Sequence, residues 1–153
     1  MHVYEESNLE NGLEKYSYLS ENQQVMQVEL DFFEYLRFFF KCPNAFYAVW
    51  EIDGKYSSAL RFEPYQDGML LEALETAPEL RRKGYAFSLM KESIRFLEAQ
   101  GPVKVYSHVS KSNSASLAVH SVCGFKRVME HAVYIDGSVI HNSCTLKYCS
   151  RSV

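Results

Sequence analysis

A strand-like apolar run, a basic turn and an amphipathic helix follow one another along residues 69–97, and this succession constrains the fold most. The turn combines three basic residues with a glycine: Arg81, Arg82, Lys83 and Gly84. The first amides of a helix lack intrahelical partners, and the helix dipole adds positive charge there. A glycine also lets an anion approach the backbone closely. The turn therefore predicts a phosphate site, with a solvated basic turn as the alternative on these residues alone.

The surrounding segments predict a mixed sheet. Residues 45–52, 55–63 and 69–76 have strand character, and Asp53-Gly54 is a hairpin turn, so three antiparallel strands are expected. The helix after the turn, over about residues 84–99, ends at Gly101-Pro102, and residues 103–109 alternate as a strand does. A strand, a crossover helix and a second strand make a right-handed unit, so the strands at 69–76 and 103–109 should be parallel.

The remaining segments complete an α/β fold class. Asn113 can cap a helix over residues 114–123, and residues 125–135 and 138–148 indicate a final hairpin. Near the start, we expect a short strand at 2–5, a short helix at 8–18 and a longer helix from Glu21 to Cys42. The prediction is a central, mostly antiparallel sheet with one parallel strand pair and flanking helices. It forms a single domain over 1–153, with a helical region at 1–44 and a core at 45–149.

Composition narrows the function classes. The 153-residue chain carries a net charge of −3, so we expect no nucleic-acid partner. No apolar run approaches the roughly 20 residues that span a bilayer, so we expect no membrane association. The four cysteines show no CxxC pair and no zinc-finger spacing. Without a signal peptide at 1–19, they indicate reduced, mostly buried thiols in a cytoplasmic protein without a bound metal.

The helix at 114–123 has two distinct stripes. Asn113, Ser116 and His120 share one, whereas Ala115, Ala118, Val119 and Val122 share the opposite one. The preceding strand carries His108 on its polar face. The two histidines and the asparagine are therefore expected to converge near the ends of the parallel strands, where mixed α/β sheets usually bind ligands.

Two motifs carry a resemblance to a known family. Arg81-x-x-Gly84-x-Ala86 resembles the acetyl-CoA-binding motif of the GNAT superfamily of N-acetyltransferases, between a strand and a helix as in that family. Asn113, His120 and the closing Gly124-Phe125 resemble its second motif. The resemblance covers residues 45–149, and residues 1–44 fit it less well.

The resemblance implies a GNAT-like fold that binds acetyl-CoA as cosubstrate in a wedge between the two parallel strands. The backbone amides of 82–86 would hold the diphosphate, the end of the strand at 69–76 would pair with the acetyl and pantetheine amides, and Asn113 and Ser116 would contact the pantetheine arm. The implied cofactor-binding residues are Leu74, Glu75, Thr76, Arg81, Arg82, Lys83, Gly84, Tyr85, Ala86, Asn113, Ser116 and His120.

Acetyl transfer to an amine needs a base for the ammonium and an acid for the departing thiolate. We expect His108 to be the base, because histidine titrates near neutrality. Glu72 is the runner-up and Glu75 is less favoured; in a regular strand they fall on opposite faces, so only one can face the cleft. His120 replaces the tyrosine that is the family's usual general acid, and an imidazolium could take that role. A satisfied structural histidine is the alternative for His108, and a neutral ring that only hydrogen-bonds the thioester sulfur is the alternative for His120.

The leading hypothesis is an acetyl-CoA-dependent N-acetyltransferase that transfers the acetyl group directly to a primary amine of a small molecule or peptide. The acidic balance, with Glu72 and Glu75 near the cleft, favours a cationic acceptor. The alternatives are a non-catalytic acyl-CoA-binding or sensing domain and an interaction module whose basic turn binds an acidic partner. A homodimer is left open.

Overall fold

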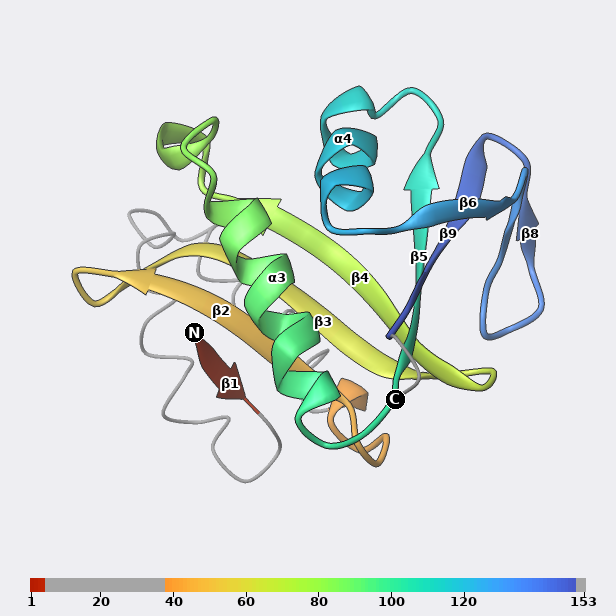
Figure 1. The fold of residues 1–153 in the computed structure, drawn as a ribbon, viewed down its shortest axis with the longest axis horizontal. Coiled ribbons are helices and arrows are strands. Elements are labelled where there is room, and N and C mark those ends of the chain that lie inside the picture. Colours follow the sequence, from red (N-terminus) through yellow and green to blue (C-terminus); the bar gives the residue numbers. More distant parts are fainter. Residues whose placement is uncertain (5–37, 151–153) are drawn as a thin grey trace.

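A seven-stranded sheet runs through the protein in the order β1-β2-β3-β4-β5-β9-β6 (Figure 1). The computed structural model describes residues 1–4 and 38–150. The strands of this sheet are β1 His2–Tyr4, β2 Phe46–Ile52, β3 Lys55–Tyr65, β4 Gly68–Thr76, β5 Lys104–Ser110, β6 Lys126–Met129 and β9 Ser143–Cys149. All neighbours are antiparallel except β4 and β5, which confirms a mixed sheet with one parallel pair.

Two helices lie on one face of this sheet, here called the helix face. They are α3 Tyr85–Glu98 and α4 Ser114–Val122, and α3 crosses β2 to β4 in Figure 1. Leu89, Met90 and Ile94 of α3 are buried against Leu60 and Phe62 of β3 in the main core. Burial of the apolar stripe of α3 therefore fixes the helix across the strands, as the helical spacing predicted.

The opposite face, here called the open face because neither α3 nor α4 lies on it, carries its own clusters. Phe39, Phe40, Ala45 and Tyr47 pack together with their aromatic rings edge to face. Tyr65, Leu70 and Tyr106 form a second buried cluster on this face. Side chains of consecutive strand residues alternate between the two faces, so each strand contributes to both layers.

The predicted final hairpin forms around the Asp136-Gly137 turn, but its two arms pair in two separate stretches. Residues 125–148 form four strands: β6 pairs with β9, whereas β7 Ala132–Val133 pairs with β8 Val139–Ile140 in a separate two-stranded sheet. The Asp136-Gly137 turn forms as expected, with Asp136 Oδ1 accepting from Ser138 N. A register shift between Arg127 and Met129 bends β6, so the following residues leave the large sheet.

Near the start of the chain, the predicted strand at 2–5 is confirmed as β1. The predicted helices at 8–18 and from Glu21 onward lie outside the described residues, except that Phe38 and Phe39 are helical. The extent of a single domain over 1–153 stays a prediction. Within 1–4 and 38–150, no helix is both long and apolar enough to cross a membrane. All four cysteines are free; Cys144 is buried and Cys149 is exposed.

Candidate active site

The parallel pairing between β4 and β5 is short. It joins Met69 to Val105, Leu70 to Tyr106 and Leu71 to Ser107, and then it stops. β4 continues to Thr76 and β5 to Ser110 without pairing with each other, and the two ribbons diverge in Figure 1. Backbone amides and carbonyls on the facing edges of the diverging segments are therefore available to a ligand. This interruption of the ladder is here called the split.

A β-bulge in β4 lies where the split begins. The register with β3 shifts between Ala59 and Arg61, and Ala73 has a left-handed φ of 52°. For a residue other than glycine, this conformation costs about 1–3 kcal/mol. A bulge bends its strand and increases the local twist, so β4 turns away from β5 at this point.

The opposite end of the ladder is held closed. Asp67 Oδ2 pairs with Lys104 Nζ at 2.7 Å, and Asp67 Oδ1 accepts a hydrogen bond from the Tyr106 hydroxyl at 2.6 Å. These contacts, that with Lys104 first, lower the pKa of Asp67 to about 2, so the carboxylate stays charged. Gly68 lies against Lys104: a Cβ at position 68 would sit 2.1 Å from the Lys104 carbonyl oxygen. The two strands therefore meet closely at one end and separate at the other.

The basic turn places the first amides of α3 near the open end of the split. Arg82 and Gly84 have φ values of 64° and 85°, and Gly84 is the N-cap of α3. Ser88 N donates the first helical bond, to the Gly84 carbonyl at 3.0 Å, so the amides of residues 85–87 lack intrahelical acceptors. No side chain in the described part of the chain caps this helix end. These amides can therefore donate hydrogen bonds to a bound anion, which is the role that the sequence predicted for them.

The basic side chains of the turn differ in what they contact. Arg82 and Lys83 are exposed. Arg81 is also exposed, but its Nε donates to the Thr76 carbonyl at 3.2 Å and so joins the turn to the end of β4. Of the three strand-end residues assigned to the cofactor, Leu74 packs against the core and the Glu75 carbonyl accepts from Ser58 Oγ at 2.8 Å.

Of the stripe of α4 that we expected to face a ligand, His120 is turned into the core, whereas Asn113 is exposed and Ser116 is half-buried. His120 is only 1% exposed, whereas Ala115, Ala118 and Val122 are exposed. His120 Nδ1 lies 2.7 Å from the Ser116 carbonyl and Nε2 lies 2.8 Å from Ser107 Oγ. A carbonyl can only accept, so Nδ1 carries the proton and Nε2 accepts from the Ser107 hydroxyl. Burial lowers the pKa of His120, which favours this neutral form.

Asn113 begins α4 as predicted. Its Oδ1 accepts from Ser116 N at 3.1 Å, which is the capping bond expected of an N-cap asparagine. The Ser116 hydroxyl lies 3.4 Å from His120 Nδ1. The polar stripe of α4 is therefore engaged mainly in capping the helix and in joining it to β5.

His108 lies on the opposite side of the sheet from His120, so the predicted convergence of the two histidines is wrong. The His108 ring packs against Tyr65 at 5.5 Å and Tyr134 at 4.8 Å between ring centroids, on the open face. Ser107, its neighbour in β5, points to the helix face and holds His120. The reason is strand alternation, since Ser107 and His108 are consecutive in β5 and their side chains point to opposite faces.

His108 is the first β5 residue beyond the paired part of the ladder. Its two ring nitrogens are buried and have no hydrogen-bond partner in residues 1–4 and 38–150. Burial lowers the pKa of His108, so the ring is neutral at pH 7. An unpaired neutral imidazole at the edge of the split can accept a proton.

Glu72 is the first β4 residue beyond the ladder, and it faces the same side as His108. Its Oε2 accepts from Arg61 Nε at 3.0 Å, across the β3–β4 pair. The expectation that Glu72 and Glu75 point to opposite faces is wrong: Glu75 pairs with Ala59 and Glu72 with Arg61, which are two apart in β3. The bulge at Ala73 adds one residue between the glutamates and brings both to the open face.

The comparison with known families decides what this arrangement belongs to. The sequence profile of the Acetyltransferase (GNAT) family matches residues 9–125, which is most of the chain. The chain belongs to the GNAT family of acetyltransferases. The predicted family and the predicted enzyme class, an N-acetyltransferase, are thereby confirmed. No curated protein matches the sequence.

Solved GNAT structures share the fold of this acetyltransferase at low sequence identity. A spermidine N-acetyltransferase chimera from Vibrio cholerae and hSSAT has a TM-score of 0.67 and 16% identity, over 97% of this chain and 93% of the other. The PaiA N-acetyltransferase from Thermoplasma acidophilum in complex with coenzyme A has a TM-score of 0.62 and 12% identity, over 98% and 100%. The ribosomal-protein-S18-alanine N-acetyltransferase from Escherichia coli has a TM-score of 0.55 and 21% identity, over 69% and 67%.

The residues of this GNAT acetyltransferase fit an acyl-CoA on the geometry of the chain alone. Uncapped amides of α3 suit a diphosphate, and the unpaired edge of β4 suits the amides of a pantetheine arm. No cluster of three or more histidine, cysteine, aspartate or glutamate side chains in the described segments could hold a metal ion. The sequence interpretation missed three neighbours of His108 and Glu72, namely Arg61, Tyr65 and Tyr134. Alternation in the strand at 55–63 could have placed Arg61 opposite Glu72, but nothing local to Tyr134 predicts its contact with His108.

Proposed function

We propose that this GNAT acetyltransferase uses acetyl-CoA as its cosubstrate and transfers the acetyl group to a primary amine of a small molecule or peptide. The split between β4 and β5 carries this proposal. It is bordered on the helix face by the uncapped start of α3 and on the open face by His108 and Glu72. A cosubstrate and an acceptor can thus approach one point from opposite sides of the sheet.

The cosubstrate would be held mainly by the backbone. The amides of residues 82–86 would bind the diphosphate, with Arg82 and Lys83 adding positive charge. The unpaired edge of 74–76 would hold the pantetheine amides, and Asn113 and Ser116 would line the other wall. Bound acetyl-CoA supplies an activated thioester carbonyl, so positioning accounts for much of the rate enhancement.

His108 would take the proton from the attacking ammonium. Its ring is neutral at pH 7 because burial lowers its pKa, and neither ring nitrogen is engaged by a described residue. Glu72 is the weaker candidate for the base because its carboxylate is already paired with Arg61. We assign Glu72 to the acceptor side of the site, beside the base.

His120 does not fit the general-acid role. Both of its ring nitrogens are hydrogen-bonded within the protein, and the ring is almost completely buried. We propose that His120 instead fixes α4 against β5 and thereby sets the wall of the cosubstrate site. Cys123 is no candidate for a covalent intermediate, because it packs against the core and burial raises its thiol pKa. Transfer would therefore be direct.

The charge near the base favours a cationic acceptor. Glu63 and Glu72 lie close together on the open face, and Arg61 is the cation that faces them. Burial, and then the proximity of Glu72, raises the pKa of Glu63. A positively charged amine would relieve this local excess of carboxylates.

Two measurements test the proposed function. Isothermal titration should show binding of CoA and acetyl-CoA, and a panel of amines should yield at least one acetylated product. Absence of any CoA binding would contradict the proposal. Tight CoA binding without transfer to any amine would instead favour an acyl-CoA sensor, the alternative suggested by a histidine at the position of the family's general-acid tyrosine.

A further inference from the structure

The β7–β8 hairpin, residues 132–140, lies against the proposed base. Its Val133 carbonyl accepts a hydrogen bond from the Tyr65 hydroxyl of β3 at 2.5 Å. The next residue, Tyr134, places its ring against His108, with an interplanar angle of 67°. A separate two-stranded sheet thus reaches the split and contacts the one unpaired histidine there.

Hydrogen bonds do not explain how the His108 ring is oriented. Catalytic histidines are usually held by an acceptor for one ring N–H, but no described residue bonds either nitrogen of His108. The contacts that restrict the ring are aromatic: Tyr65 at an interplanar angle of 83° and Tyr134 at 67°. The ring is therefore oriented by being held between two tyrosines.

We propose that Tyr134 is the positioning residue for His108: its ring fixes the imidazole at the edge of the split and keeps water from it. This inference rests on the proposed function, in which His108 is the base. Tyr65 belongs to a buried cluster with Leu70 and Tyr106 and is fixed by the core itself. Tyr134 comes from a short hairpin, so the catalytic geometry depends on that hairpin being in place.

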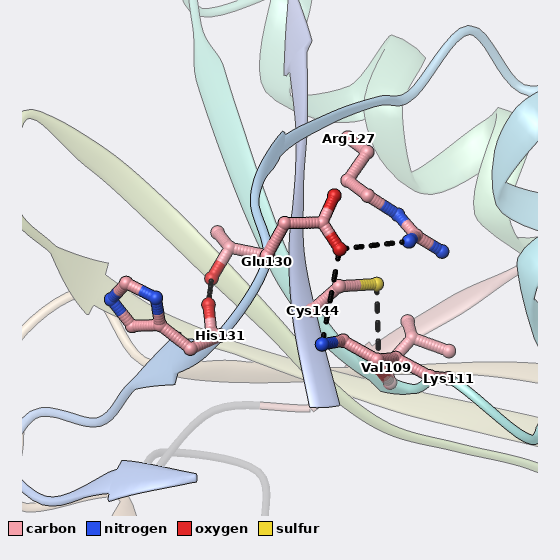
Figure 2. A network of polar contacts seen from close by, with 7 residues as sticks. Val109, Lys111, Arg127, Glu130, His131 and Cys144 are labelled. Carbon is pink, nitrogen blue, oxygen red and sulfur yellow. Dashed lines mark hydrogen bonds and ion pairs between the residues drawn. The ribbon is translucent and has the colours of Figure 1, made fainter. Parts of the chain in front are cut away.

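The base of the hairpin is anchored firmly enough for this role. Figure 2 shows Glu130 between Arg127 and Lys111, at 3.2 Å and 3.8 Å. The next carbonyl, that of His131, accepts from the Thr145 hydroxyl of β9 at 2.7 Å. The turn beyond Tyr134 is closed by Tyr134 N donating to the Ser138 carbonyl at 2.9 Å. The chain on both sides of Tyr134 is thus tied down.

Among residues 1–4 and 38–150, few other groups could control the titration of His108. The titratable and charged groups that point to this face include Arg61, Glu63 and Tyr65 of β3, Glu72 of β4, Tyr106 of β5, Lys147 of β9 and Tyr134 of the hairpin. Glu72 is paired with Arg61, and Lys147 lies over the Tyr106 ring at 5.1 Å. Loss of the Tyr134 ring would therefore act on His108 chiefly by admitting water.

The test compares Tyr134→Ala with Tyr134→Phe in the full-length protein, and Ile135→Ala is the matched control. Ile135 is the next residue in the same hairpin, but its side chain is 57% exposed. Ring-proton NMR would follow the titration of His108 without cosubstrate. Steady-state kinetics with acetyl-CoA and an amine that the enzyme acetylates would give the acid limb of the pH profile of kcat/KM.

We expect Tyr134→Ala to raise the pH at the midpoint of the His108 titration toward about 6.5, the value of an exposed histidine. The acid limb should move with it, and kcat should fall roughly ten-fold with KM for acetyl-CoA unchanged. Tyr134→Phe should restore the wild-type midpoint and kcat, because the ring and not the hydroxyl makes the contact. Ile135→Ala should leave both unchanged.

Three outcomes would overturn the inference. They are an unchanged His108 midpoint in Tyr134→Ala, a defect in Tyr134→Phe as large as that in Tyr134→Ala, or an equal effect of Ile135→Ala. If the alanine variant does not fold, Tyr134→Leu replaces it, since an aliphatic side chain fills the position without the aromatic edge. If the titration midpoint of His108 moves but the acid limb of kcat/KM does not, the contact with Tyr134 stands. That result would contradict the role of His108 as base, and so the proposed function.

Discussion

Ser107 and His108 are consecutive residues of β5, yet one holds a histidine on the helix face and the other is a histidine on the open face. Ser107 Oγ lies 2.8 Å from His120 Nε2, whereas the His108 ring packs against Tyr134. The two histidines are therefore separated by the sheet itself. His108 is the proposed base and has no hydrogen bond to a described residue, whereas His120 is a buried connector, so substitutions of the two should differ in kind.

Substitution of His108 should impair chemistry and spare cosubstrate binding. We expect His108→Asn to lower kcat by about 10²–10⁴, the range for loss of a general base. The Kd for CoA should change little, because the amides of α3 are on the other face of the sheet. Stopped assays at saturating acetyl-CoA, together with calorimetry, would measure both. A wild-type kcat in this variant would shift the role of base to Glu72.

Substitution of His120 should impair stability first. His120→Ala removes a buried ring and leaves Ser107 Oγ and the Ser116 carbonyl without their partner, so the free energy of unfolding should fall by about 2–4 kcal/mol. Urea denaturation would measure the loss. The expectation fails if the variant is as stable as the wild type and only kcat declines, since that pattern belongs to a general acid.

Stability should decrease as the pH falls below about 6.5. Burial lowers the pKa of His108 and of His120 in the folded protein, so between the folded and unfolded pKa values the unfolded chain binds more protons. The free energy of unfolding therefore rises with pH in that window and levels off above the unfolded value. Urea midpoints between pH 5 and 8 would show this, and His120→Phe should flatten the slope.

The closed end of the ladder should be intolerant of a side chain at position 68. In Gly68→Ala, the new Cβ would meet the Lys104 carbonyl oxygen, so β4 and β5 must separate at a cost of about 1–3 kcal/mol. Gly137→Ala is the comparison, because its Cβ would contact nothing and only the left-handed φ of 85° is penalised. Thermal unfolding of both variants would separate steric from conformational cost. A Gly68→Ala variant as stable as the wild type would mean that the approach of the two strands is not strained by a methyl group.

Substitution of Gly84 should weaken binding of the diphosphate and leave binding of the rest of the cosubstrate unchanged. Its φ of 85° is costly for other residues, and a Cβ there would meet no protein atom, so Gly84→Ala disturbs chiefly the helix end that faces a ligand. We expect the Kd for CoA to rise about ten-fold. Titration with pantetheine, which lacks the diphosphate, is the control and should be unaffected. A parallel loss of pantetheine affinity would place the diphosphate elsewhere.

Sequence reasoning worked where the determinant is local. The turn before α3 follows from Gly84 and its basic neighbours, and the start of α4 follows from Asn113, because caps and turns depend on the residues themselves. The mixed sheet followed in the same way from alternation and from the crossover rule.

The rest depended on non-local contacts. Nothing in the sequence around Ala73 indicates a bulge, since an alanine at φ 52° carries no glycine or proline signal. Glu72 and Glu75 were therefore expected on opposite faces. In α4, polarity suggested that His120 would face a ligand. Two hydrogen bonds instead allow the histidine to be buried, and small apolar side chains are left on the surface.

The contact of Asp67 with Lys104 and Tyr106 has a consequence for acyl selectivity. It holds the two strands together where they meet, whereas the thioester would lie where they part. The angle between the strands is therefore set by residues that lie away from the thioester. Residues that never touch an acyl chain would then decide how long a chain can enter. Selection for a new acyl donor would be expected to alter the turn at 66–68 as readily as the residues that border the split.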